Sequence, residues 1–137
     1  DRLASDLDIL RRLWCKWMLN VGVNQAVMVA EGTYATVQKP GPVRQMMKAA
    51  MAEVVALAQR EGIRVTMEDL DDYVELIDSL NPGGMPSMRQ DGLARRPSEV
   101  EFFAGTVIRR AEKAGLEVPV NRELYRRIKE MENSWLG

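Results

Sequence analysis

The chain contains no histidine and only one cysteine, Cys15. A single cysteine cannot form an internal disulfide. Zinc sites are built mainly from cysteine and histidine, and the familiar hydrolase triads need a histidine as their base. The composition therefore argues against a zinc centre and against nucleophilic catalysis of the Ser/His/Asp or Cys/His kind, and we expect no metal site.

Long apolar runs and an excess of one charge are also missing. No run approaches the roughly 18 apolar residues of a membrane span, and no signal peptide is visible. Lys plus Arg total 19 and Asp plus Glu total 20, so the net charge is −1. This balance argues against a nucleic-acid or membrane-surface partner recognised through bulk charge. We expect a cytoplasmic protein.

Helical periodicity, in contrast, runs through most of the 137 residues, and no segment alternates like a strand. Thr66 and Ser98 are each placed to cap a helix, with Asp69 and Glu101 three residues further on. Because the chain opens with Asp1 and enters the helical pattern at once, we interpret it as a piece of a longer protein. We expect one all-α domain of five or six helices, with breaks at Lys39–Pro42, Glu61–Gly62, Asn81–Gly84 and Gly115.

The first expected helix, Leu3–Glu31, carries a polar row in an otherwise apolar stretch: Lys16, Asn20 and Asn24. Residues four apart on a helix drift by only about 40°, so the three form one stripe about 12 Å long. Burying a carboxamide without partners costs roughly 1–3 kcal/mol. The row suits a cleft in which the lysine donates to a substrate oxygen and the amides bind a polar ligand. A lysine that reaches solvent, beside carboxamides that bond neighbouring helices, explains it equally well.

Two further stretches bring functional groups together. Ser87–Asp91 reads SMRQD and follows a Pro-Gly-Gly break, and Ser98 and Glu99 stand at an expected helix start. A carboxylate at the first helical position is favoured by the helix dipole. The structural alternatives are equally simple: both serines are helix caps, and Glu99 is a solvated acid of the first turn.

Taken together, these stretches resemble the ketopantoate reductase (2-dehydropantoate 2-reductase) family, from about Asp6 to Ile128. The matching motifs are Lys-x3-Asn-x3-Asn at 16–24, Ser-Met-x-Gln-Asp at 87–91, Ser-Glu-x-Glu at 98–101 followed by Gly105, and the segment 115–121 before the last helix. Pro86 and Ala104 depart from the commoner Ser and Asn of the family. The chain has no G-x-G-x-x-G and no βαβ pattern, so the resemblance is to the C-terminal half alone.

The resemblance implies that residues 1–137 are the helical substrate-binding and dimerisation domain, with the N-terminal Rossmann domain absent from the chain. It implies NADPH-dependent reduction of 2-dehydropantoate, a 2-keto acid, to pantoate in pantothenate and coenzyme A biosynthesis. By matched position, Lys16 is the catalytic acid, and Glu99 orients it and lies near the nicotinamide. Asn20, Asn24 and Ser87 match substrate-binding positions. We expect a homodimer, NADPH held mainly by the missing domain, and no activity from this chain alone.

Two other interpretations stay open. One is a non-catalytic helical module whose polar row binds a partner or bridges a dimer. The other is a related reductase that acts on a different 2-keto acid. They differ in what Lys16 does, because only a reductase needs its proton.

Overall fold

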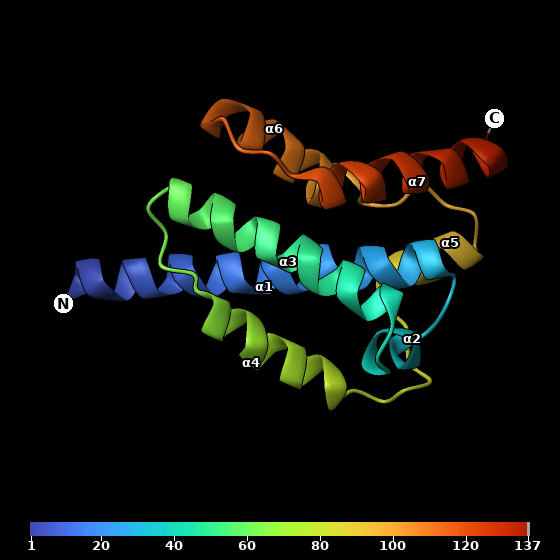
Figure 1. Ribbon diagram of the computed structural model, residues 1–137, viewed down its shortest axis with the longest axis horizontal. Coiled ribbons are helices and arrows are strands. Elements are labelled where there is room, and N and C mark those ends of the chain that lie inside the picture. Colours follow the sequence, from blue (N-terminus) through green and yellow to red (C-terminus); the bar gives the residue numbers. More distant parts are fainter. Residues whose placement is uncertain (137) are drawn as a thin grey trace.

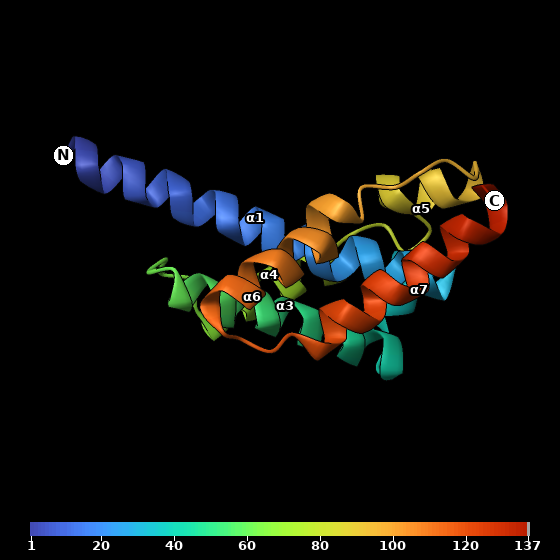
Figure 2. The same cartoon turned by 90° about the horizontal axis from the view of Figure 1, so that it is seen from above.

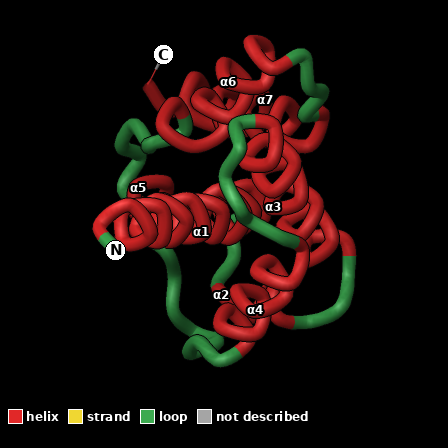
Figure 3. Tube along the Cα trace, turned by 90° about the vertical axis from the view of Figure 1, so that its left-hand side faces the viewer, coloured by secondary structure: helices red, strands yellow, loops and turns green. Residues whose placement is uncertain are grey.

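The architecture is three layers of helices. The computed structural model describes residues 1–136, and these contain helices and loops but no strand. In Figure 1, α1 and α3 cross in the middle layer, with α6 and α7 on one side and α2 and α4 on the other; Figure 3 shows the same layers from the end of α1. The all-α expectation is confirmed. The elements are α1 (Arg2–Ala30), α2 (Tyr34–Gln38), α3 (Pro42–Arg60), α4 (Met67–Asp78), α5 (Ser87–Leu93), the π-helical turn η1 (Glu101–Gly105), α6 (Thr106–Ala114) and α7 (Pro119–Leu136).

The core forms around the second half of α1. Every residue from 21 to 29 is buried, and α1 contacts α3, α4, α5 and α7. A helix that is apolar on most sides is stable only when neighbours cover all of it. Methionines fill much of the core: Met18 and Met28 of α1 and Met47 and Met51 of α3 are fully buried. Despite this apolar stretch, none of the helices within residues 1–136 combines the length and apolarity needed to cross a membrane.

The first half of α1 extends beyond the other helices, as Figure 2 shows. Residues 2–10 of this helix are all exposed. Leu3, Leu7 and Leu13 are 64%, 57% and 60% exposed, and Leu10 is 39% exposed. Their spacing of three or four residues puts them along one side of the helix. This leucine stripe (Leu3, Leu7, Leu10 and Leu13) is an apolar surface that the rest of residues 1–136 leaves open to solvent.

The structure has seven α-helices within residues 1–136, where five or six were expected. The additions are short: α2 has five residues and α5 has seven, and periodicity cannot be read over so few positions. The capping prediction at Thr66 is confirmed. Its hydroxyl accepts from the Asp69 backbone N–H at 3.1 Å, and the Asp69 carboxylate accepts from the Thr66 N–H at 2.9 Å.

The second predicted capping box, Ser98 with Glu101, is wrong. Val100 stands at the N-cap of η1, and the Ser98 hydroxyl donates to Glu132 of α7 at 2.5 Å. The Glu101 carboxylate accepts from the Tyr125 hydroxyl at 2.7 Å instead of turning back to Ser98. Ser98 and Glu101 therefore bond to Glu132 and Tyr125 of α7 and not to each other. These tertiary contacts replace the local capping box that the sequence predicts.

Candidate functional site

The polar row lies on one side of α1 and becomes more buried along the helix. Lys16 is exposed, Asn20 is half-buried, and Asn24 is 8% exposed. The row starts beside η1, where the Trp17 indole Nε1 donates to the Phe102 carbonyl at 3.1 Å. It runs toward α5, which packs against the C-terminal half of α1. The row is therefore open to a ligand at its lysine end.

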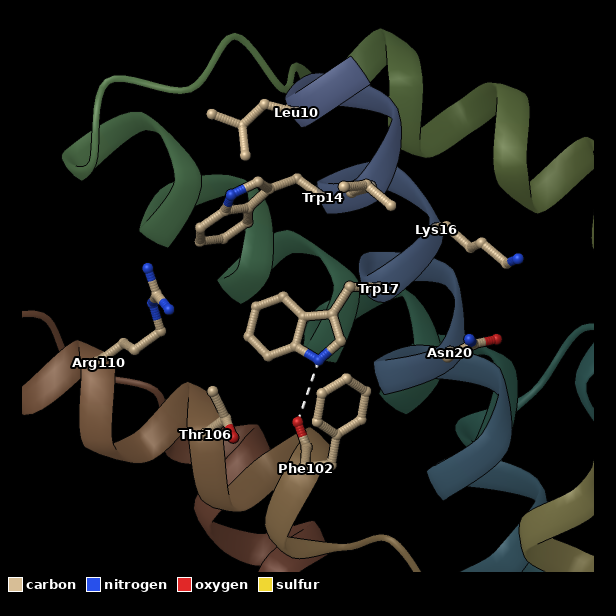
Figure 4. Close-up of a pocket in the computed structure, with 9 residues that line it drawn as sticks. Leu10, Trp14, Lys16, Trp17, Asn20, Phe102, Thr106 and Arg110 are labelled. Atoms are coloured by element: carbon tan, nitrogen blue, oxygen red, sulfur yellow. Dashed lines mark hydrogen bonds between the residues drawn. The ribbon is translucent and has the colours of Figure 1, made fainter. Parts of the chain in front are cut away.

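A pocket of about 420 Å³ opens at that end, between α1 and the start of α6. Figure 4 shows Lys16 and Asn20 at one edge, with their polar ends directed away from Trp14 and Arg110. The opposite wall is mainly aromatic and aliphatic. The lining residues are Leu10, Leu13, Trp14, Lys16, Trp17, Asn20, Phe102, Thr106 and Arg110.

The apolar wall of the pocket is fixed by specific contacts. Trp14 and Trp17 pack edge to face, with ring centroids 5.3 Å apart and planes at 85°. The Arg110 guanidinium lies over Trp14, 5.3 Å from the ring centroid, and its Nε donates to Glu61 at 2.8 Å. This Arg110 hydrogen bond holds the pKa of the Glu61 carboxyl below its usual range. Because Arg110 is engaged by both Trp14 and Glu61, it closes the wall and is not a free cation.

The structure brings only part of the predicted site into the pocket. Lys16 and Asn20 line it, whereas Asn24, Ser87 and Glu99 do not. Ser87 is exposed at the start of α5, and Glu99 is exposed in the turn that leads into η1. Glu99 is thus displayed beside the helical turn that Trp17 holds against α1. Within residues 1–136, no three His, Cys, Asp or Glu side chains gather to hold a metal ion.

Cys15, next to Lys16 in the sequence, takes no part in this surface. It is 1% exposed, and burial raises the pKa of its thiol. Its side chain packs in the core, because successive residues of a helix point about 100° apart.

Sequence reasoning missed two buried polar residues that hold η1 in place. Gln25 of α1 accepts from the Ala104 N–H at 3.0 Å, and Glu132 of α7 accepts from the Ser98 N–H at 3.2 Å. Gln25 had a signal, because a polar residue inside a run of buried ones needs a partner. Glu132 had none, since it stands on an amphipathic helix among other charged residues.

Comparison with known proteins decides the family. A model of the family described as "Ketopantoate reductase PanE/ApbA C terminal" matches residues 8–132. The chain belongs to this family. The 2-dehydropantoate 2-reductase of Vibrio cholerae is 33% identical over 128 residues, which are 93% of this chain and 43% of that protein. The Shigella flexneri enzyme of the same name is 30% identical over 129 residues, or 93% of this chain and 41% of that protein.

Solved structures share the fold. A dimeric ketopantoate reductase from Staphylococcus aureus superposes with a TM-score of 0.85 at 23% identity, over 92% of this chain and 44% of that one. A D-mandelate dehydrogenase, solved with NADH and anilino(oxo)acetate, has a TM-score of 0.83 at 21% identity, over 93% and 42% of the two chains. The resemblance to ketopantoate reductases is confirmed. The roles of Lys16, Asn20, Asn24, Ser87 and Glu99 stay predictions.

Proposed function

We propose that this chain is the C-terminal substrate-binding and dimerisation domain of an NADPH-dependent 2-dehydropantoate 2-reductase, which reduces ketopantoate to pantoate for pantothenate synthesis. The observation that carries the proposal is Lys16. Lys16 is exposed at the edge of a pocket that Asn20 also lines, on a helix whose second half is buried in the core. Family membership and the named relatives support the reaction.

In this proposal Lys16 is the general acid. NADPH supplies a hydride to the keto carbon of the substrate. The carbonyl oxygen then gains negative charge, which an ammonium already in place stabilises and protonates. The Glu99 carboxylate holds that ammonium in position, and Asn20, Asn24 and Ser87 bind the hydroxyl and carboxylate of the substrate.

The cofactor itself needs a second domain. Residues 1–136 form helices and loops, with no βαβ unit on which a dinucleotide pyrophosphate could sit. The chain spans less than half the length of its named relatives. We infer that a Rossmann domain preceding these residues in the full-length protein holds NADPH, and that Glu99 faces the nicotinamide across the cleft. The isolated chain should then be inactive, and steady NADPH oxidation by it would contradict this arrangement.

The leucine stripe is a surface that other parts of the full-length protein could cover. Four leucines between 39% and 64% exposed are costly to leave in water. We propose that the preceding domain and a second copy of the chain cover the exposed apolar faces, giving a homodimer. The Staphylococcus aureus relative is described as dimeric. Light scattering of the full-length protein at micromolar concentration checks this, and a monomeric mass would refute it.

The deciding experiment compares Lys16→Ala with wild type in the full-length protein, following NADPH absorbance with ketopantoate. A positioned general acid contributes about 10²–10⁴-fold, so kcat should fall by that amount while circular dichroism stays unchanged. Lys48→Ala is the matched control, because Lys48 is an exposed lysine of α3 outside the pocket. Equal activity in Lys16→Ala and wild type would remove Lys16 as the acid and favour a non-catalytic interaction module.

A reductase for a different 2-keto acid is the second candidate. Trp14, Trp17 and Phe102 give the pocket an aromatic wall, which suits a bulky apolar substituent. The D-mandelate dehydrogenase that shares the fold was solved with an anilino ligand. The same assay with phenylglyoxylate in place of ketopantoate separates the two, since the better substrate has the higher kcat/KM.

A further inference from the structure

The segment that carries Glu99 is held by α7 at one end. Glu132 is 6% exposed, and its Oε2 accepts both the Ser98 N–H at 3.2 Å and the Ser98 hydroxyl at 2.5 Å. The same hydroxyl oxygen accepts from the Val100 N–H at 3.3 Å. Glu99 therefore lies between two residues whose backbone N–H groups are both tied, directly or through Ser98, to one buried carboxylate.

Burying a carboxylate is expensive unless it is well bonded. Within residues 1–136, the hydrogen bonds to Glu132 come from Ser98 alone. An uncharged apolar residue at this place would fill the space at lower cost. The carboxylate thus has a specific task at Ser98, which is to fix the backbone immediately before Glu99.

The other end of the segment is held by α1. In η1 the Gly105 N–H bonds to the Val100 carbonyl at 2.9 Å, five residues back, and this leaves the Ala104 N–H without its helical partner. Gln25, which is fully buried, accepts that N–H at 3.0 Å. Trp17 donates to the Phe102 carbonyl at 3.1 Å.

The two α1 anchors stand next to the polar row. Trp17 follows Lys16 in the sequence, and Gln25 follows Asn24. The helix that carries Lys16 therefore also holds η1 in place. Glu132 holds the loop segment at Ser98, which leads into η1. Moving Ser98 would shift the backbone at Glu99 while leaving both α1 anchors intact.

We propose that Glu132 is a positioning residue, which fixes the Glu99 carboxylate relative to the Lys16 ammonium through its two hydrogen bonds to Ser98. The inference rests on the proposed function of Lys16 and Glu99. Glu132 touches neither substrate nor cofactor and acts through Ser98. A misplacement of about 1 Å at a catalytic group can cost on the order of 10²-fold in rate.

The test uses the full-length protein with NADPH and ketopantoate, at a temperature where circular dichroism shows every variant folded. Glu132→Leu removes the acceptor, and its kcat should fall about 10- to 100-fold with little change in the KM for ketopantoate. Glu132→Gln keeps an acceptor oxygen and should restore kcat to near the wild-type value. Ile128→Val, one turn earlier on α7 and fully buried, is the control for general destabilisation and should keep its kcat.

Wild-type kcat in folded Glu132→Leu overturns the inference, and so does an equal fall in Glu132→Gln or Ile128→Val. If Glu132→Leu fails to fold, Ser98→Ala removes the hydroxyl that bonds both Glu132 and the Val100 N–H and keeps the Ser98 N–H bond to Glu132; an unchanged kcat there also overturns the inference. The proposed function has its own control. If wild type turns over and Lys16→Ala does not, the proposed function holds whatever the result for Glu132. If wild type shows no turnover, both the proposed function and the role of Glu132 are refuted.

Discussion

Replacing Gly22 with alanine should destabilise the chain, although alanine is the better helix former. A Cβ at Gly22 would lie 2.4 Å from Met51 Cγ, 2.9 Å from Met51 Sδ and 3.1 Å from the Met47 carbonyl oxygen. Met51 is fully buried, so its side chain has no open space to enter. Helix propensity favours alanine by about 1 kcal/mol. Overpacking a filled core costs about 1–3 kcal/mol, and two separate obstacles put this site at the upper end. The free energy of unfolding should therefore fall by about 1–2 kcal/mol.

Urea unfolding of the 137-residue chain, followed by circular dichroism, measures this difference at constant m. Gly83→Ala is the matched control, because a Cβ there meets only Asn81 Oδ1, at 3.8 Å, and its effect should stay within about 0.5 kcal/mol. In a Met51→Ala background the loss of stability caused by Gly22→Ala should be smaller, because Met51 Cγ and Sδ are no longer present. A Gly22→Ala chain as stable as wild type would show that α1 and α3 are not packed this closely.

Two other changes test the caps and ion pairs. Thr66→Ala should lower the free energy of unfolding by about 1 kcal/mol because the N-cap acceptor of α4 is lost, whereas Thr66→Ser keeps it; equal losses in both variants, measured by urea unfolding, would contradict the cap. The hydrogen bond from the Tyr125 hydroxyl, followed by the hydrogen bond from Arg109 and the positive charge of Lys129, holds the pKa of the Glu101 carboxyl below its usual range. A depressed folded-state pKa contributes stability above the unfolded-state pKa, and that contribution is lost as the pH falls through the folded-state value. Thermal melts of Glu101→Gln should therefore depend less on pH in the acid range than those of wild type, and parallel curves would refute the assignment.

The long helices could be predicted from the sequence because their signals are local. The apolar run in α1, the proline that opens α3 and the box Thr66–Asp69 each act within a few residues. The helix α2 has only five residues, and its cap, in which the Thr36 hydroxyl accepts from the Thr33 N–H at 3.2 Å, lacks the Glu or Gln that marks a capping box in a sequence. The turn η1 depends on the hydrogen bond between Gln25 and the Ala104 N–H. The two residues are 79 positions apart, so local sequence patterns cannot predict this bond.

The candidate site divides in the same way. The spacing of Lys16, Asn20 and Asn24 is a property of one helix, so the sequence predicts their shared side correctly. The pocket also needs Thr106 and Arg110 from α6, and only the folded chain shows that they face α1. Glu99 illustrates the limit: its motif could be recognised, but its support by Glu132 comes from the last helix.

Stability and catalytic geometry should respond to different positions on α1. An alanine at Gly22 pushes α1 away from α3, and Gly22 lies between Asn20 and Asn24. The turn η1 is bonded to α1 itself, through Trp17 and Gln25, so it should move together with the helix. The placement of Glu99 relative to Lys16 is then insulated from the spacing of α1 and α3. Gly22→Ala should lower the free energy of unfolding and leave kcat nearly unchanged. Glu132→Leu should lower kcat with a smaller loss of stability. If both variants lowered kcat in proportion to the stability they lose, the packing of the domain as a whole, and not these hydrogen bonds, would set the site.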